Sequence, residues 1–500
     1  MNLDWLETRA YISGNSLAVI DSINHRQWSY IELNQRAVTL AHYLQQHQIK
    51  KGDRVVVISC NHICHLDLFF ACNKIGAIYV PLNWMFTAVE LNNLIQDCQP
   101  KAIFYNSQSL DDKYRPQALI TIDILTEQYE QIFTQTRIKE PLEILTDQEL
   151  PAVLLYTSGS TGKPKGAIIS HRTIIANASS TIPSWNLTQQ DRTITFSPMF
   201  HTAGIFCLVI PLLMVGGSIV LQSRFQPKES LELIKEYKPS LIFMVPTMYY
   251  LLNESNVLTK KDLSNVRLFI SGGAPISKQV KQQFEELNLP LIDSFGLTEA
   301  GPNTFYIDPR DPKNKQGSVG KPILFTKLRL VDEYNQPVEV GKIGQIVVCG
   351  DTLYSGYWDS EKGLDSVEVQ EEFHTGDLAM IDQDGYFYIM GRIKELIISG
   401  GENVIPREVC DCLQSHPLVK DCVVVGCPDN KWGEIVSAAV ILNEDAVDFE
   451  QKLIQHCRAK LAKYKVPKII IKMNEYPKIG TGKINIREIA RLIAKQHQCQ

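Results

Sequence analysis

The chain has 500 residues, of which 44% are hydrophobic and 21% charged, and its formal net charge is −5. This length exceeds what one hydrophobic core usually holds, so about three structural units are expected. The balance of residue types is that of an ordinary globular enzyme, and the mildly acidic charge argues against a nucleic-acid partner.

We expect neither a targeting segment nor a membrane-spanning segment. Residues 1–7 read MNLDWLE, which is unlike a secretory signal, so a cytoplasmic location is expected. The longest apolar run, Ile205 to Leu221, contains Pro211 and the pair Gly216-Gly217. It therefore predicts a buried helix followed by a strand rather than a transmembrane span.

The twelve cysteines predict reduced thiols and no disulfide framework. Two groups of Cys and His, over residues 60–65 and 410–427, contain residue types that bind metals. Neither has the paired spacing of a structural zinc site, so we interpret both as ordinary buried thiols.

Helix-like and strand-like patterns alternate over residues 1 to about 150. Helices are expected over 30–44, 62–75 and 88–96, and strands within 51–59, 76–80 and 101–105. Such alternation predicts a parallel sheet covered by helices. It continues over residues 151 to about 320. From about residue 320, short strands and turns predict an antiparallel or barrel-like module.

The most informative stretch is Tyr156 to Gly166, YTSGSTGKPKG, between the apolar runs 151–155 and 167–169. Its glycines let backbone N–H groups converge on an anion, and its hydroxyls and lysines add further donors, a combination typical of a polyphosphate site. It is not a Walker loop, because Thr157 and Pro164 occupy positions that require Gly and Ser or Thr. The candidate phosphate ligands are Thr157, Ser158, Gly159, Ser160, Thr161, Gly162, Lys163 and Lys165.

This string resembles the phosphate loop of the adenylate-forming superfamily, which includes acyl-CoA synthetases, luciferases and peptide-synthetase adenylation domains. The resemblance extends over about residues 25–490. It implies an α/β fold with a large N-terminal domain of helix-covered sheets plus a β-barrel-like module, and a small mobile α+β C-terminal domain. It also implies ATP, Mg²⁺ and coenzyme A as reactants and cofactor.

Several further motifs carry the resemblance in the large domain. His201, within PMFHTAG, is similar to a histidine that lies between the acyl site and the thiol channel. Asp293–Glu299, DSFGLTE, implies a phosphate contact for Thr298 and a Mg²⁺ ligand in Glu299. Relatives usually have Tyr where Phe295 stands, so a phenolic hydrogen bond is absent there. The resemblance also implies an adenine-binding turn, formed by Gly272, Gly273, Ala274, Phe295 and Gly296. It implies an acyl pocket that includes His201, Gly204 and Met244.

The remaining motifs lie toward the C-terminus. Asp377 resembles the family's ribose ligand, and Arg392 resembles its partner on the nucleotide. Lys394 is expected to be the hinge about which the C-terminal domain swings. Gly400 and Gly401 are expected to line the pantetheine tunnel, and Lys483, in PKIGTGK, resembles the catalytic lysine. We thus expect an AMP-binding domain over 1–391 (sub-modules about 1–150, 151–320 and 321–391), a hinge over 392–396 and a C-terminal domain over 397–500.

The function implied is an ATP-dependent acid–CoA ligase that acts through an acyl-AMP intermediate. The segments 200–207 and 243–249 contain no carboxylate for an amino-acid ammonium and no basic residue for a second carboxylate. PMFHTAG and its apolar helix are most similar to bacterial fatty-acyl-CoA synthetases, which favours a medium- or long-chain fatty acid. Aryl or succinylbenzoate-type acids, transfer to a separate carrier protein and a catalytically inactive acyl-binding role remain alternatives.

Overall fold

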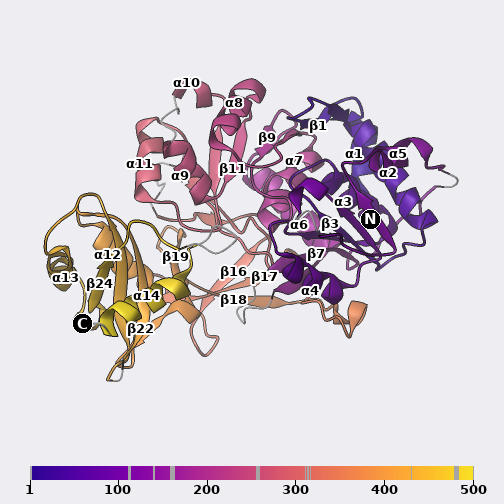
Figure 1. The fold of residues 1–500 in the computed structure, drawn as a ribbon. Helices are drawn as coiled ribbons and strands as arrows, with labels where there is room; N and C mark the ends of the chain where they lie inside the picture. The colour runs from indigo at the N-terminus through magenta and orange to yellow at the C-terminus, as the bar shows by residue number, and fades with distance from the viewer. Residues whose placement is uncertain are drawn as a thin grey trace. The chain divides into compact units, whose positions relative to one another are not determined.

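The computed structural model describes residues 3–110, 114–138, 141–157, 164–254, 260–309, 311, 315, 317–429, 431–477 and 484–498 (Figure 1). The chain divides into two compact units. Unit 1 comprises Met1–Leu328 and Val348–Phe373, and unit 2 comprises Arg329–Val347 and His374–Gln500.

Unit 1 contains a six-stranded sheet in the order β6-β5-β3-β4-β7-β8. Its strands are β3 (Arg54–Ile58), β4 (Ile78–Leu82), β5 (Ala102–Tyr105), β6 (Ile120–Asp123), β7 (Pro151–Thr157) and β8 (Lys165–Ser170). All neighbours run parallel except the β7–β8 pair. This confirms the parallel sheet expected from the alternating pattern, with a hairpin at one edge.

Helices cover both faces of this sheet because successive side chains of a buried strand point to opposite sides. Val55 and Val57 of β3 join a core that includes α2 (Tyr30–Gln46) and α3 (Cys64–Ile75). Val56 and Ile58 join a different core, which includes α4 (Ala88–Cys98). The other α-helices of this region are α1 (Trp5–Ser13) and α5 (Glu127–Gln135).

The second sheet of unit 1 has seven strands in the order β13-β12-β11-β9-β10-β1-β2. They are β1 (Leu17–Asp21), β2 (Gln27–Ser29), β9 (Arg192–Thr195), β10 (Ser218–Leu221), β11 (Leu241–Met244), β12 (Leu268–Ser271) and β13 (Leu291–Asp293). Neither sheet is built from one continuous stretch of sequence. Strands β1 and β2, from before residue 150, belong to the second sheet, and β7 and β8, from after it, belong to the first. Helices α6 (His171–Ser184), α7 (Val209–Val215), α8 (Pro227–Tyr237), α9 (Pro246–Glu254) and α11 (Lys278–Glu286) accompany it.

The apolar run from Ile205 to Leu221 forms a helical segment and a strand, as predicted. A π-helical turn, Ala203–Cys207, precedes α7, and β10 follows at Ser218. None of the helices in the described ranges is long and apolar enough to cross a membrane.

Unit 2 contains two sheets. The first has the order β16-β17-β18-β19, and its last two strands run antiparallel, in agreement with the predicted β module. These strands are β16 (Lys327–Val331), β17 (Ile343–Cys349), β18 (Glu372–Ile381) and β19 (Phe387–Arg392).

The C-terminal α/β domain is built on a sheet of order β21-β20-β23-β22, with β24 beside β23. Its strands and helices are β20 (Ile397–Ser399), β21 (Glu402–Val404), α12 (Pro406–Gln414), β22 (Val419–Asp429), β23 (Gly433–Leu442), α13 (Phe449–Lys460), β24 (Ile469–Lys472) and α14 (Ile486–Gln498).

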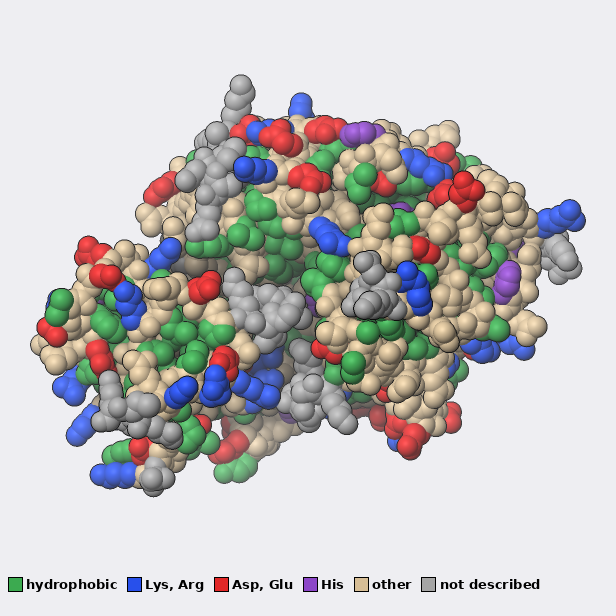
Figure 2. Space-filling view, in the orientation of Figure 1, with side chains coloured by type: hydrophobic (Ala, Val, Ile, Leu, Met, Phe, Trp, Pro, Cys, Tyr) green, Lys and Arg blue, Asp and Glu red, His purple; other side chains and the backbone are tan. Residues whose placement is uncertain are grey.

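On the face of the molecule shown in Figure 2, acidic and basic side chains are interspersed over most of the surface.

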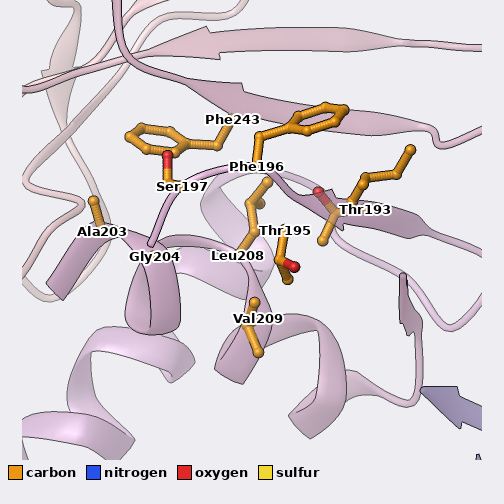
Figure 3. A pocket seen from close by; sticks show the side chains of 10 residues that line it. Thr193, Thr195, Phe196, Ser197, Ala203, Gly204, Leu208, Val209 and Phe243 are labelled. Carbon is orange, nitrogen blue, oxygen red and sulfur yellow. The ribbon is translucent and has the colours of Figure 1, made fainter. Parts of the chain in front are cut away.

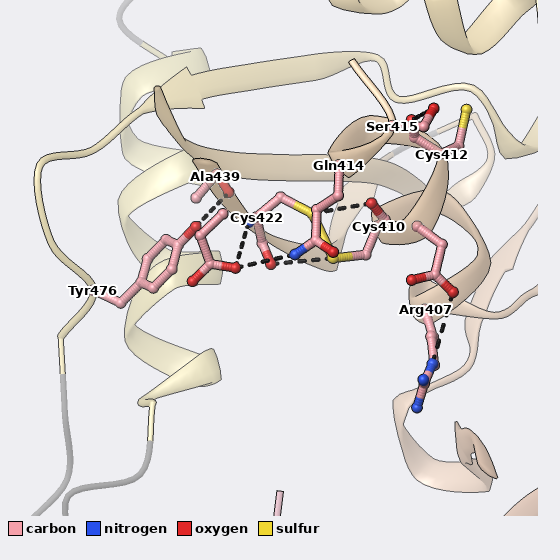
Figure 4. The surroundings of a disulfide bond; sticks show 10 residues. Arg407, Cys410, Cys412, Gln414, Ser415, Cys422, Ala439 and Tyr476 are labelled. Atoms are coloured by element: carbon pink, nitrogen blue, oxygen red, sulfur yellow. Dashed lines mark hydrogen bonds and ion pairs between the residues drawn. A yellow bond between two sulfur atoms is a disulfide. The ribbon is translucent and has the colours of Figure 1, made fainter. Parts of the chain in front are cut away.

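The cysteines of this domain require one correction. Cys410 on α12 and Cys422 on β22 form a disulfide, with Cα atoms 6.0 Å apart, so they are not ordinary thiols (Figure 4). Helix α12 packs against β22, which brings the two Cα atoms to a separation that a disulfide spans. The sequence shows neither that packing nor the separation. Cys412 and Cys457 lie nearby as free thiols, with Sγ atoms 3.9 Å apart.

Candidate active site

The hairpin β7–β8 brings the two flanks of the predicted phosphate loop together. Thr157 and Lys165 are the paired residues next to the connecting loop, and the Thr157 hydroxyl donates to the Lys165 carbonyl at 3.4 Å. The strands on both sides of the loop are thus as predicted. Six candidate ligands lie outside the described residues: Ser158, Gly159, Ser160, Thr161, Gly162 and Lys163. The predicted catalytic Lys483 also lies outside them.

The segment 354–358 lies beside β8 and was missed by the sequence analysis. The Ser355 N–H donates to the Ile168 carbonyl at 2.7 Å, and the Ile168 N–H donates to the Gly356 carbonyl at 3.0 Å. The Trp358 N–H donates to the Gly166 carbonyl at 2.7 Å. These bonds fix the backbone around Tyr357 at the lysine-bearing strand. The string YSGYW contains no charged residue, and so it offered no signal of a site.

Thr298 and Glu299 lie in a tight turn that follows β13. Leu297 and Gly301 form an isolated bridge that closes the turn, and Gly301 has a φ of +87°. A Cβ added to Gly296 would lie 2.0 Å from the Pro302 carbonyl oxygen, so only glycine fits there. The glycines of this motif therefore fix the backbone of the turn that carries Glu299.

Tyr357 connects this turn to the hairpin. Its hydroxyl donates to Glu299 Oε1 at 2.8 Å, and the Lys165 ammonium nitrogen lies 5.2 Å from its ring centre. The Tyr354 N–H also donates to the Glu299 carbonyl at 2.9 Å. Burial and the neighbouring Glu299 carboxylate raise the pKa of Tyr357, which keeps the phenol protonated. Lys165 and Glu299, far apart in sequence, thus approach the same aromatic side chain.

The predicted adenine turn leaves the sheet beside the Glu299 segment. Gly272, Gly273 and Ala274 follow β12, whose neighbour β13 runs parallel, with Ser271 opposite Asp293. Gly273 and Ala274 are exposed, and Gly273 has a φ of +83°. The half-buried Phe295 follows β13, with its ring 5.8 Å from that of Phe305. The carboxyl ends of neighbouring parallel strands are where α/β folds bind ligands.

A small pocket lies between β9, the π-helical turn and Phe243 (Figure 3). Its lining residues are Thr193, Ile194, Thr195, Phe196, Ser197, Ala203, Gly204, Leu208, Val209 and Phe243. None of them is charged. The hydroxyls of Thr193 and Ser197 are buried and make no hydrogen bond to a described residue.

Of the three residues predicted for the acyl pocket, Gly204 lies in its lining. A Cβ there would lie 1.9 Å from the Pro198 carbonyl oxygen, which explains the glycine. Met244 is buried in the hydrophobic core that surrounds β11, next to the pocket residue Phe243. His201 is exposed, with its ring 4.4 Å from that of Phe200.

In unit 2, Asp377 and Arg392 are paired residues of β18 and β19. Arg392 Nε donates to Asp377 Oδ1 at 2.9 Å. The Asp377 side chain is 4% exposed, and its other oxygen, Oδ2, is buried with no hydrogen-bond partner among the described residues. Burial raises the pKa of Asp377, and the Arg392 guanidinium opposes this effect. The Asp377–Arg392 pair, which the sequence predicts to contact the nucleotide, therefore has one acceptor, Asp377 Oδ2, without a hydrogen bond to a described residue.

The other three candidates in the described part of unit 2 lie on either side of β20. Lys394 is exposed in a short 3-10 helix, Ile393–Glu395. Gly400 and Gly401 form the two-residue turn between β20 and β21, with φ values of +62° and +86°. Such a turn requires positive φ at both positions, which explains the glycine pair.

The residues of the Glu299 turn are suitable for a hard cation. Mg²⁺ prefers oxygen ligands and usually takes one or two carboxylates, water and substrate phosphates. Glu299 supplies a carboxylate and Thr298 a hydroxyl, and no group of three or more His, Cys, Asp or Glu side chains suited to a metal occurs in the described ranges. An ion at this turn would therefore need oxygens from the substrate as well.

Comparison with known proteins identifies the class. Residues 6–358 match the model of the AMP-binding enzyme family, and residues 408–483 match that of the AMP-binding enzyme C-terminal domain. A feruloyl-CoA synthase of Amycolatopsis is 33% identical over 97% of this chain and 98% of its own length. The long-chain-fatty-acid–CoA ligase FadD13 of Mycobacterium tuberculosis is 31% identical, covering 97% of each chain. The structure of ATP-bound MatB from Rhodopseudomonas palustris has a TM-score of 0.87 at 28% identity, over 99% of this chain and 100% of that chain.

The chain belongs to the AMP-binding enzyme family, within the adenylate-forming superfamily. It is an AMP-forming acid–CoA ligase. The large and small domains expected from the resemblance are therefore present in the order predicted.

Proposed function

We propose that this ligase activates a carboxylic acid with an uncharged, largely apolar tail, in two half-reactions. The acid's carboxylate attacks the α-phosphorus of ATP, and the bond from that phosphorus to pyrophosphate breaks. The thiol of coenzyme A then attacks the acyl carbon of the acyl-AMP, loses its proton and expels AMP. The observation that carries the substrate class is the uncharged lining of the small pocket between β9, the π-helical turn and Phe243.

The residues of unit 1 supply charge where two anions must meet. Lys163, Lys165 and the loop hydroxyls would hold the β- and γ-phosphates. Thr298 and Glu299 would hold Mg²⁺, which supplies positive charge beside the phosphates. The turn over Gly272–Ala274, with Phe295, would accept the adenine.

The residues of unit 2 serve the ribose and the acyl centre. The unused Oδ2 of Asp377 is an acceptor for a ribose hydroxyl, and Arg392 holds that carboxylate in place. Lys483 would contact the acid's carboxylate and the α-phosphate. Rotation about Lys394 would then withdraw Lys483 and present Gly400 and Gly401 to the pantetheine arm.

The substitution Lys483→Ala tests this division of labour. We expect pyrophosphate release from ATP and acid to fall by about a hundredfold or more, because a charge that acts at the transition state is lost. Thioester formation from supplied acyl-AMP should remain measurable. An equal loss in both half-reactions would contradict the role given to Lys483.

Among acids with apolar tails, we favour a medium- or long-chain fatty acid. The PMFHTAG motif, the mainly aliphatic and aromatic pocket lining and the likeness to a long-chain-fatty-acid ligase support this choice. Burying an alkyl chain stabilises a complex by about 0.8 kcal/mol per methylene, so the KM should fall as the acid lengthens until the pocket is full.

A second candidate, an aryl acid, is favoured by the unpartnered hydroxyls of Thr193 and Ser197. Buried hydroxyls are normally hydrogen-bonded, and a hydroxylated ring could supply the partner. The likeness to a feruloyl-CoA synthase supports this second candidate.

A panel of octanoate, palmitate, cinnamate and ferulate separates the two candidates. Pyrophosphate release and thioester mass should be measured with wild type and with Ser197→Ala. Turnover of the fatty acids supports the first candidate. A preference for ferulate over cinnamate that Ser197→Ala removes supports the second. Supplying an acyl carrier protein in place of coenzyme A tests the alternative acceptor, which is supported if release then depends on the carrier.

A further inference from the structure

Tyr357 lies between two side chains of opposite charge that form no ion pair. Its ring lies under the Lys165 ammonium, and its hydroxyl donates to Glu299 Oε1. Among the described residues, neither Lys165 nor Glu299 has an ion-pair partner. An ammonium and a carboxylate attract each other when they come into contact. The Tyr357 side chain contacts both groups, so it is placed to keep them from pairing directly.

The backbone fixes the position of the Tyr357 ring without help from its hydroxyl. Ala167 and Tyr357 form an antiparallel bridge, and the Trp358 N–H bonds to the Gly166 carbonyl. The Tyr354 ring packs against the Tyr357 ring with centroids 5.0 Å apart. A tyrosine that served only the core would not need a carboxylate partner and a cation on its ring face. The ring is thus a rigid spacer, and the hydroxyl is a separate function.

We infer that Tyr357 is a positioning residue for adenylation, which keeps Lys165 and Glu299 apart and orients the Glu299 carboxylate. Each charged group then remains available, Lys165 for phosphate and Glu299 for a divalent cation. The phenol–carboxylate bond occupies Oε1, which restricts rotation of the carboxylate. This inference rests on the proposed roles of Lys165 and Glu299 in the same site.

The variant Tyr357→Phe keeps the spacer and removes only the hydroxyl. Losing a hydrogen bond to a charged group changes an equilibrium by roughly ten- to a hundredfold, so the half-saturating Mg²⁺ concentration for pyrophosphate release should rise about tenfold. The kcat at saturating Mg²⁺ should change less. Thioester formation from supplied acyl-AMP should match wild type. The matched control is Tyr114→Phe, which removes the hydroxyl of a buried tyrosine that donates to Asn92 elsewhere in unit 1.

A second variant, Tyr357→Leu, removes the spacer as well. Lys165 can then approach Glu299, so we expect a larger rise in the Mg²⁺ requirement than with Tyr357→Phe. Adding Lys165→Gln to Tyr357→Leu should restore part of the Mg²⁺ affinity, although not the affinity for ATP. A merely structural role predicts no such rescue, and thermal unfolding of each variant checks that the fold is intact.

Two results would overturn the inference. The first is a Mg²⁺ dependence of Tyr357→Phe equal to that of Tyr114→Phe. The second is an equal loss in both half-reactions. The variant Glu299→Gln separates these failures from failure of the proposed function. If Glu299→Gln leaves adenylation intact, the role of Glu299 is wrong and the inference falls with it. If Glu299→Gln impairs adenylation and Tyr357→Phe does not, only the inference is wrong.

Discussion

Glu299 in unit 1 and Asp377 in unit 2 are both carboxylates proposed to contact the nucleotide complex, but their surroundings differ. Glu299 lies half-buried in a loop turn and accepts a hydrogen bond from the neutral phenol of Tyr357. Asp377 lies in a strand, is almost fully buried and is paired with the guanidinium of Arg392. One carboxylate has a neutral partner and the other a permanently charged one.

This difference determines what each group can still bind. A carboxylate held by a phenol retains its negative charge and can attract a cation. A carboxylate held by an arginine is largely neutralised, and a second cation there would meet the repulsion of the guanidinium. Its free oxygen instead suits a neutral donor such as a hydroxyl. The two carboxylates are therefore not interchangeable, and substitutions that remove only charge should affect different steps.

The largest effect is expected from Glu299→Gln. The amide is a poor ligand for Mg²⁺, so adenylation should slow by roughly a hundredfold at ordinary Mg²⁺ concentrations and partly recover as Mg²⁺ is raised. Pyrophosphate release measured over a range of free Mg²⁺ checks this. Affinity for AMP without metal should stay near wild type. A variant that lost AMP affinity but kept its Mg²⁺ response would reverse the assignment of the two carboxylates.

A smaller effect, on binding rather than on Mg²⁺ dependence, is expected from Asp377→Asn. The charged acceptor for a ribose hydroxyl is lost, and such bonds contribute about 1.5–3 kcal/mol, so AMP affinity should fall roughly ten- to a hundredfold. Titration calorimetry with AMP measures this, and the Mg²⁺ dependence of turnover should keep its midpoint. The half-exposed Arg392 can turn to water, so the fold should tolerate the change.

Much of the fold was predictable because local pattern and burial agree. The alternation of apolar strands and amphipathic helices over residues 30–105 gave each element close to its observed bounds. Which sheet a strand joins was not predictable. The apolar strands β1 and β10 pair although about 200 residues separate them, and neither segment contains a feature that identifies the strand it pairs with. Proximity of Cys410 and Cys422 depends on the packing of α12 and was missed for the same reason.

The candidate site stood out in the sequence where its residues combine an unusual backbone with charged or hydroxyl groups. The glycines at 296, 301, 400 and 401 occupy tight or left-handed positions, and motifs that contain them stand out in the sequence. Asp377 and Arg392 were matched by motif, and β18 and β19 place them opposite each other. Tyr357 was not found, because a tyrosine reveals neither its hydrogen-bond partner nor the cation on its ring until the fold is known.

The smallest expected effect is a pH dependence of AMP affinity that involves Asp377 and not Glu299. Burial raises the folded-state pKa of Asp377 above the usual value of 3.8, and its unfolded form titrates near that usual value. Protonation therefore favours the folded state, and the contribution of Asp377 to stability is present at low pH and is lost as pH rises through the folded pKa. Nucleotide binding responds in the opposite sense, because a protonated Asp377 is a weaker acceptor.

Affinity for AMP should thus fall by a few-fold as the pH is lowered toward the folded pKa of Asp377. Because that pKa is raised, the fall should begin at a higher pH than for an aspartate with the usual pKa. Calorimetric titration at several pH values, with urea unfolding at the same values, measures both responses. Asp377→Asn has no proton to gain, so its weaker AMP affinity should lose this pH dependence, whereas Glu299→Gln should keep it. If Asp377→Asn keeps the wild-type pH profile, another group controls the titration and Asp377 does not accept a hydrogen bond from the ribose.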